Sequence, residues 1–524
     1  MTRRTKVAAL VSTGVFMASL DLFIVNIAFT DIQRDFEGST LGGLSWVLSA
    51  YAIVFAAALV PAGRWFDRVG RKRGFLAGVS LFGVASAICA VAPGVEVLVA
   101  ARILQALGAA MLMPTSLGLL LPEFPPEKRA GAVALWAAVG GVAAAAGPPL
   151  GGLLVELSWR WVFIVNVPIA LAAVLIGRTL LNEIRDPEPG PRPDLVGAAL
   201  LVVAIALLTW GVVEAPDHGW GGLRTVGGLL GSVIALVAFA ARSRTHAAPV
   251  VPPEIVARPA FSWSTATSLL FYVAFGSMLL NGVLLLTQLW DYSTLLAGLA
   301  LAPGPAVAAA TASRGGGLVT RFGARPVMMA GALAFATGAL YGHFAVEATP
   351  NYLTAFLPAN LIGGFGVGLI LPSTANAAFG ALPPTLLSTG IAVFTVARQV
   401  GSALGVAILV AVYASPANAT ELANAVQGGY LMMAISAGLA LLLATQVRVA
   451  AAGAGPAGDG GRGDDASSDA QRSRADRDEL DEAFAEEAMR LPMPIPHVAD
   501  PPTAARNAGQ ATDANPSTNG RVSA

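Results

Sequence analysis

An acidic residue stands inside an apolar run near the N-terminus, and it is the first candidate for chemistry. Asp21 lies in the segment MASLDLFIVNIAF. A charged side chain near the middle of a bilayer costs roughly 2.5–3.5 kcal/mol on insertion scales, so it must face a cavity or a partner. A carboxylate in that position can take up and release a proton. A permanent structural ion pair is the alternative interpretation.

Depth along the helices indicates Arg102 as the partner of Asp21. Asp21 stands about 14 residues, or roughly 21 Å, from the start of a helix that runs from inside to outside. Arg102, in ARILQALGAA, stands about four residues, or roughly 6 Å, from the start of a helix that runs the other way. Both groups then lie in the outer-middle region of a hydrocarbon core about 30 Å thick, so a pair is geometrically allowed. Alternatively, Arg102 only snorkels to the surface.

A segment rich in charge and glycine, GRWFDRVGRKR, follows the second apolar run. Its arginines form a cytoplasmic cluster that could latch two halves of the protein in one state. Asp67 could cap or anchor the start of the next helix, where the helix dipole favours an anion. Plain positive-inside topology explains the basic residues but not Asp67. The candidate latch residues are Gly63, Asp67, Arg68, Gly70 and Arg71.

A second segment, GPPLGG, lies within an apolar run and contains Gly147, Pro148, Gly151 and Gly152. Glycines allow two helices to approach closely, and proline removes a backbone donor and bends its helix. The segment could therefore act as a hinge and as a seal against leak. Glycine and proline are common in membrane helices, so the pattern alone is weak.

Polar and aromatic residues in other apolar runs are candidates for lining a substrate cavity. Each of the polar ones could instead make an interhelical hydrogen bond. Arg398 is a buried charge with no obvious acid at the same depth, and it could meet a substrate anion, a carbonyl or a helix end. The candidates are Phe23, Asn26, Gln105, Asn281, Gln288, Asn360 and Arg398.

The sequence gives no sign of a cofactor or metal. Four histidines and one cysteine are too few and too scattered for a metal site. A phosphate-binding loop with the Gly-x-x-x-x-Gly-Lys-Ser/Thr pattern is missing, so no built-in ATP motor is expected.

The elements that must position these residues are membrane-spanning helices. Of the 524 residues, 55% are hydrophobic and 12% are charged, whereas soluble proteins carry roughly 25% charged residues. Apolar runs of about 18 or more residues recur along the chain. The composition predicts an all-α polytopic membrane protein in the lipid bilayer and gives no indication of nucleic-acid binding. Fourteen candidate helices occupy about 7–29, 45–63, 74–92, 98–121, 130–155, 161–181, 195–213, 223–241, 262–288, 295–313, 326–345, 352–378, 386–413 and 427–447.

The distribution of charge predicts how the chain is placed in the membrane. Arginine and lysine cluster at the N-terminus and in alternate connections, which predicts a cell (inner or plasma) membrane protein with both termini in the cytoplasm. Residues 451–524 carry 13 acidic and 7 basic residues, so an acidic segment follows a basic body in a chain of zero net charge. This composition predicts a disordered acidic cytoplasmic tail over 450–524.

Two related segments indicate an internal repeat. GRWFDRVGRKRGF and GGGLVTRFGARPVM follow the second and the tenth candidate helices and share Gly-x-x-x-x-Arg-x-Gly. Repeats of this kind are typical of transporters. The repeat predicts an N-terminal six-helix bundle at 1–192, two additional linker helices at 193–245 and a C-terminal six-helix bundle at 246–449.

Together, and in this order, the segments resemble the major facilitator superfamily, and within it the fourteen-helix drug:proton antiporters. GRWFDRVGRKR resembles the motif between helices two and three, and ARILQALGAA resembles the helix-four motif with its buried arginine. GPPLGG is similar to the core of the antiporter motif, although Ala134 and Ala143 replace two upstream glycines. LDLFIVNIAF, WRWVFIVNVPIA and ARQVGSALG are similar to features of the fourteen-helix branch, and the resemblance covers about residues 7–447.

The resemblance implies a major facilitator fold of two six-helix bundles plus two extra central helices. It implies a monomeric, proton-coupled antiporter, and no enzyme, that exports hydrophobic or cationic small molecules by alternating access. In this hypothesis a proton binds Asp21 and weakens its pair with Arg102, and substrate and proton compete for the site. A dedicated exporter of one metabolite or antibiotic is the nearer alternative, and a polytopic membrane enzyme or sensor is the remote one.

Overall fold

The computed structural model describes residues 2–36, 38–186, 191–413, 416 and 418–447, in which all regular elements are helical. Thirteen helices of this part are long and apolar enough to cross a membrane. The remaining predicted span, 130–155, corresponds to α6 (Pro126–Val155), whose described apolar stretch is Val139–Val155. The prediction of an all-α polytopic fold is therefore confirmed. The predicted tail, 450–524, lies outside the described residues.

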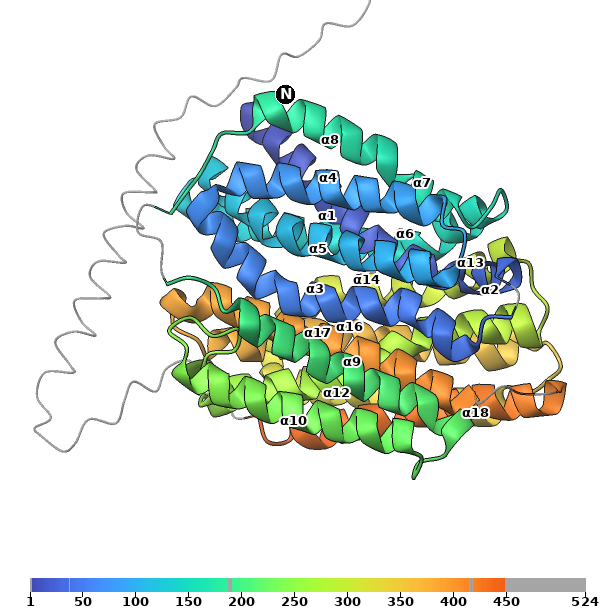
Figure 1. The fold of residues 1–524 in the computed structure, drawn as a ribbon. Helices are drawn as coiled ribbons and strands as arrows, with labels where there is room; N and C mark the ends of the chain where they lie inside the picture. Colours follow the sequence, from blue (N-terminus) through green and yellow to red (C-terminus); the bar gives the residue numbers. More distant parts are fainter. Residues whose placement is uncertain (1, 37, 187–190, 414–415, 417, 448–524) are drawn as a thin grey trace, which may run out of the picture. The chain divides into compact units, whose positions relative to one another are not determined.

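Six long helices form the first group, because each is apolar on most of its surface and buries that surface against its neighbours. In this group α4 packs on α5, α3 on α5, α1 on α6 and α4 on α8 (Figure 1). The members are α1 (Arg3–Ile27), α3 (Leu41–Val69), α4 (Arg71–Ala90), α5 (Val95–Leu120), α6 and α8 (Asn166–Leu180), with short α2 (Phe29–Asp35), η1 (Leu121–Glu123) and α7 (Trp161–Ile164) between them.

Basic side chains gather where α1 begins, and we call this the basic end. There, Arg3 Nη1 lies 2.6 Å from Glu123 Oε1, which joins the start of α1 to η1. Lys72 Nζ donates to the Arg178 carbonyl at 2.8 Å, which joins α4 to the end of α8. The opposite end holds α2 and α13 (Thr294–Leu301), at the right of Figure 1.

Two additional helices, α9 (Leu195–His218) and α10 (Leu223–Thr245), follow the first group. Asp194 accepts from the Gly197 N–H at 2.8 Å and from Arg242 Nε at 2.6 Å, so it caps α9 and ties it to the last turn of α10. α9 packs on both α3 and α17 (Pro384–Tyr413), whereas α10 packs mainly on α9. The pair therefore lies along the junction of the first and second helix groups.

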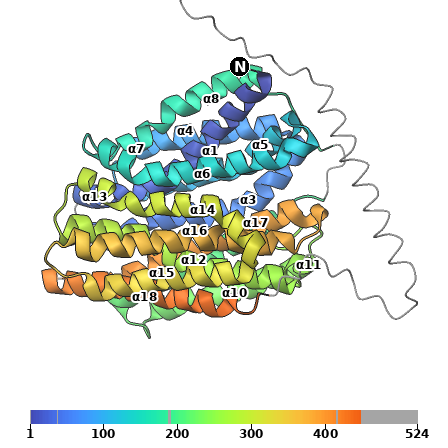
Figure 2. The same ribbon diagram turned by 180° about the vertical axis from the view of Figure 1, so that it is seen from behind.

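The second group repeats the arrangement of the first. Helix α12 packs on α17 and α18, and α16 packs on α14 and α15, as Figure 2 shows. The elements are α11 (Pro253–Val256), α12 (Pro259–Leu284), η2 (Leu285–Leu289), α13, α14 (Pro303–Phe322), α15 (Ala324–Ala345), η3 (Tyr352–Phe356), α16 (Leu357–Gly380), α17 and α18 (Ala419–Ala444).

The segment 63–73 is more helical than expected from the sequence. Helix α3 continues to Val69 and α4 begins at Arg71, so only Gly70 separates them. Gly70 has φ of +132°, a conformation that residues with a side chain rarely adopt. The predicted helix 295–313 also differs, because it is two helices that meet at Ala302, before Pro303, and the second extends to Phe322.

Candidate transport site

Asp21 is fully buried in the first helix group, where it forms an ion pair with Arg102. Its carboxylate also accepts from Gln105 Nε2 at 2.8 Å and from Asn166 Nδ2 at 3.4 Å. Ser86 on α4 accepts a second hydrogen bond from Gln105 Nε2 at 2.9 Å, so hydrogen bonds join side chains of α1, α4, α5 and α8 around this carboxylate. The charge on Asp21 is therefore stabilised by donors from α5 and α8, and the site is closed to solvent in this conformation.

Arg102 is also fully buried, and its position is fixed by more than the ion pair. Its Nε donates to the Val47 carbonyl at 3.0 Å, and its Nη1 donates to Gln105 Oε1 at 2.6 Å. The guanidinium carbon lies 4.2 Å from the centre of the Tyr51 ring, a cation–π distance. Arg102 does not snorkel to the surface, since its side chain is 1% exposed.

Three members of this network were not predicted as site residues. Ser86 and Tyr51 are single polar or aromatic residues in apolar helices, a common occurrence in membrane proteins. Asn166 lies in the segment WRWVFIVNVPIA, which indicated the family but not a site. Gln105 was expected to face a substrate cavity. In this conformation its side chain is buried and holds Asp21 and Arg102, and the cavity role stays a prediction.

The residues of the predicted latch contact other parts of the first group. Asp67 does not cap α4, because the Lys72 N–H is bound by Glu183 Oε1 at 3.0 Å. The Asp67 carboxylate instead accepts from Nε of Arg71, the first residue of α4, at 2.7 Å, which is the anchoring alternative. Arg71 Nη1 donates to the Gly118 carbonyl at the end of α5, at 3.1 Å. A side chain at Gly63 would contact Pro114, also on α5. Arg68 is half-buried in the last turn of α3, and the latch function stays a prediction.

The glycines of the GPPLGG segment lie between the two helix groups. A Cβ at Gly147 would lie 2.6 Å from Phe23 Cβ, and one at Gly151 would lie 3.0 Å from Ile24 Cγ1, so this face packs on α1. A Cβ at Gly152 would lie 2.9 Å from Leu295 Cα on α13, and Pro148 meets Gly298 of the same helix. Small residues therefore let α6 contact α1 and α13 at once.

Side-chain hydrogen bonds join the two groups at this opposite end. Thr294 Oγ1 donates to Asp31 Oδ2 at 2.8 Å, and Gln288 Nε2 donates to Gln33 Oε1 at 2.9 Å. Gln288, a cavity candidate, is therefore a bridging residue on the exposed surface in this conformation. The two helix groups are in direct contact at the end away from the start of α1.

We expect Gly152→Val to decrease transport activity at least tenfold. Its branched side chain cannot fit against the Leu295 backbone without separating α6 from α13, which opens the contact at the opposite end. Gly141→Val is the matched control, since a Cβ at Gly141 on the same helix meets nothing within 4 Å. Dye efflux is measured for Gly152→Val and Gly141→Val at equal membrane abundance. Equal activity of the two variants would contradict the prediction.

The remaining cavity candidates have varied environments. Asn26 Nδ2 donates to the Leu22 carbonyl of its own helix at 2.9 Å. Asn281 is buried, accepts from the Tyr413 hydroxyl at 2.9 Å and donates to the Val426 carbonyl at 3.5 Å, which is the interhelical alternative. Phe23 is half-buried against Gly147. Arg398 is half-buried beside Tyr272.

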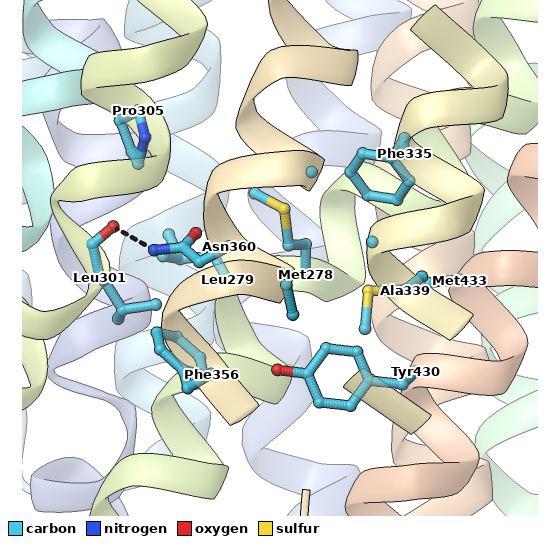
Figure 3. Close-up of a pocket in the computed structure, with 13 residues that line it drawn as sticks. Met278, Leu279, Leu301, Pro305, Phe335, Ala339, Phe356, Asn360, Tyr430 and Met433 are labelled. Atoms are coloured by element: carbon cyan, nitrogen blue, oxygen red, sulfur yellow. Dashed lines mark hydrogen bonds between the residues drawn. The ribbon is translucent and has the colours of Figure 1, made fainter. Parts of the chain in front are cut away.

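Asn360 lines a cavity of about 40 Å³ inside the second group. Figure 3 shows its side-chain nitrogen bonded to the Leu301 carbonyl, at 3.2 Å, with the Tyr430 hydroxyl pointing toward Phe356. Pockets for drug-sized ligands measure roughly 300–1,000 Å³. This cavity is too small to hold such a ligand. In the part of the chain that the structure describes, no cluster of three or more His, Cys, Asp or Glu side chains could hold a metal ion.

Comparison with known proteins identifies the fold and the relatives. Residues 11–318 match the model of the Major Facilitator Superfamily. The tetracenomycin C resistance and export protein of Streptomyces glaucescens is 34% identical, over 77% of this chain and 75% of that protein. The multidrug resistance protein Stp of Mycobacterium tuberculosis is 32% identical, over 80% of this chain and 78% of that protein. The puromycin resistance protein of Streptomyces alboniger is 36% identical, over 74% and 78%.

Solved structures of distant transporters share the fold. A bacterial homologue of the human lysosomal transporter Spinster aligns with a TM-score of 0.64 at 14% identity, covering 86% of this chain and all of that one. A POT family transporter in complex with 5-aminolevulinic acid aligns with a TM-score of 0.63 at 12% identity, covering 83% and 94%.

Proposed function

Because this chain belongs to the Major Facilitator Superfamily and is related to drug resistance and efflux proteins, we propose that it is a proton-coupled exporter of hydrophobic small molecules. Membership of a family of transporters confirms that it is a multi-pass membrane protein and not an enzyme, which excludes the remote alternative of a membrane enzyme. The buried ion pair between Asp21 and Arg102 is the observation that carries the coupling.

The proposed coupling follows from what protonation does to this network. With a proton on Asp21, Arg102 loses its counter-charge inside a site from which water is excluded, and the ionic part of the contact disappears. The hydrogen bonds that Gln105 and Asn166 donate to Asp21 are also weakened, because a neutral carboxyl is a poorer acceptor than a carboxylate. A proton therefore destabilises the present packing of α1 on α5 and α8, and favours a second conformation.

The orientation of the cycle is part of the proposal. If the basic end faces the cytoplasm, as its arginines favour, the contacts of α6 with α13 and of Asp31 with Thr294 close the outer side. Opening that side would let an external proton reach Asp21 and let substrate leave. Both helix groups belong to one chain, so a monomer is a sufficient transport unit.

The test is efflux of the neutral dye N-phenyl-1-naphthylamine from energised cells that express the protein. We expect a protonophore to abolish the efflux, because it removes the proton gradient. Efflux that a protonophore leaves unchanged would overturn the proton coupling.

A dedicated exporter of one compound remains a second candidate. The Streptomyces glaucescens relative is named as a resistance and export protein for a single compound. Competition between unrelated dyes separates the two possibilities. Several dyes that each inhibit efflux of the others support multidrug export, whereas efflux of only one chemical type supports a dedicated exporter.

A further inference from the structure

Arg398 is a charge in the middle of a membrane helix, and no acid of the described part of the chain forms an ion pair with it. It lies about 14 residues, or roughly 21 Å, from the start of α17, in a helix of 30 residues. Ion pairs among the described residues do not include it, and its Nε is buried without a hydrogen-bond partner. Intramembrane arginines are costly and usually pair or line a substrate path. Arg102, the buried arginine of the first helix group, is neutralised by Asp21.

The position of Arg398 is fixed by close packing of α17 on α12. A Cβ at Gly401 would lie 2.9 Å from Tyr272 Cβ, and a Cβ at Gly276 would lie 2.6 Å from Ser402 Cα. These glycines hold the two helices in one register, and the guanidinium carbon then lies 4.6 Å from the centre of the Tyr272 ring. The cation is therefore held against an aromatic face before any ligand arrives.

The same part of α12 carries hydroxyl groups with unused donors. Ser268 and Ser264 precede Tyr272 by one and two helical turns, so they share its side of the helix. Both hydroxyls are buried without hydrogen-bond partners, unlike Ser277, which donates to the Ala274 carbonyl at 2.9 Å. Serine in a helix usually bonds a carbonyl of the preceding turn, as Ser277 does. The half of α12 that precedes Tyr272 therefore carries buried hydroxyl groups that are available to donate hydrogen bonds to a ligand.

We propose that Arg398, Tyr272 and these α12 hydroxyls bind the acidic group of an aromatic organic anion, such as a carboxylate or an ionised phenol. A fixed guanidinium with a free Nε–H attracts an anion and repels a cation, and a planar ring of the ligand can stack on the guanidinium plane, as the Tyr272 ring does. This inference deepens the proposed export function and rests on it for its transport role. It predicts that, among the expected substrates, acidic aromatic molecules bind more tightly than cationic ones.

Anion export has an electrical consequence. When a proton enters as an anion leaves, both movements carry positive charge inward, so an inside-negative potential drives the exchange for any number of protons. A monocation exchanged for one proton carries no net charge. In proteoliposomes without a pH gradient, a potassium diffusion potential set by valinomycin should therefore accelerate fluorescein transport by the wild type.

Equilibrium binding tests the site independently of transport. The full chain in lipid nanodiscs is titrated with fluorescein, an anion, and with rhodamine 123, a cation on the same xanthene core. We expect tighter binding of fluorescein by the wild type. Arg398→Gln should weaken fluorescein binding at least tenfold without weakening rhodamine binding, as the loss of a charge-assisted hydrogen bond requires. Arg398→Lys should retain part of the preference for fluorescein. Tyr272→Phe should keep the contact between the Arg398 guanidinium and the aromatic ring.

Arg160→Gln is the matched control. Arg160 also lies on an aromatic ring, 4.4 Å from the centre of Trp159, but it pairs with Asp35 at 2.7 Å, so its loss should not change fluorescein affinity. The proposal is overturned if wild type prefers rhodamine, or if Arg398→Gln weakens both dyes equally. If the wild type shows no preference for fluorescein but its efflux is still sensitive to a protonophore, only this inference is rejected. Anion preference without such efflux would reject only the proposed function.

Discussion

Replacing Asp21 by asparagine is expected to decrease protonophore-sensitive export at least a hundredfold. Asparagine keeps the size of the side chain and can still accept from Gln105 and Asn166, but it cannot take up a proton or carry the charge that pairs with Arg102. The two conformations are then no longer linked to proton binding, since a group that never changes its protonation state cannot couple proton movement to an equilibrium.

Energised dye efflux and equilibrium dye binding should be measured together on the Asp21→Asn variant. Loss of efflux with retained binding identifies a coupling defect, because a misfolded protein would lose both. Unchanged energised efflux at equal membrane abundance would remove Asp21 from the coupling step.

Asp35→Asn is the control for removal of a carboxylate. Hydrogen bonds from Trp159 Nε1, at 2.9 Å, and from Arg160 Nη1, at 2.7 Å, hold the pKa of the Asp35 carboxyl below its usual range. Asp35 therefore stays ionised at neutral pH and cannot carry protons through a cycle. Its contribution to stability is present above the pKa of the unfolded chain and is lost only as the pH falls through the lowered pKa. Asp35→Asn should export normally at pH 7.

The sequence was sufficient to predict the spans and the depth of the charged residues, for a physical reason. Bilayer thickness sets the length of an apolar run, and the rise of 1.5 Å per residue turns a sequence position into a depth. Asp21 and Arg102 could be placed at one level by this arithmetic, and the structure brings them into contact.

The rotation of each helix about its own axis was not predictable from the sequence. Helices α1 and α5 are apolar on most sides, so they carry no polar stripe that would indicate which face turns toward which neighbour. Gln105 was therefore assigned to a cavity although it faces Asp21. Ser86 and Asn166 were missed for the same reason. Glu183 was missed as the group that binds the start of α4 because it lies 111 residues from Lys72 in the chain.

Removing Arg102 is expected to destabilise the protein more than removing both members of the pair. Arg102→Gln leaves Asp21 as a fully buried carboxylate without a counter-charge, a change that costs about 3–5 kcal/mol in buried pairs. In the double variant Asp21→Asn/Arg102→Gln neither charge remains, and the two amides can bond each other and Gln105. Most of the lost stability should return. Thermal unfolding of the four purified proteins gives the coupling energy of the pair.

The same double variant separates the two interpretations of the ion pair. If the pair were only structural, restoring stability would also restore export, since the packing of α1 on α5 would be recovered. If Asp21 carries the proton, the double variant folds, binds dye and still fails to export against a gradient. If the loss of stability in the double variant equals the sum of the losses in the two single variants, a direct interaction is contradicted. Groups in contact deviate from this sum by roughly 0.5–3 kcal/mol. A stable double variant that does not export would therefore assign Asp21 to coupling and Arg102 to holding its charge in the membrane.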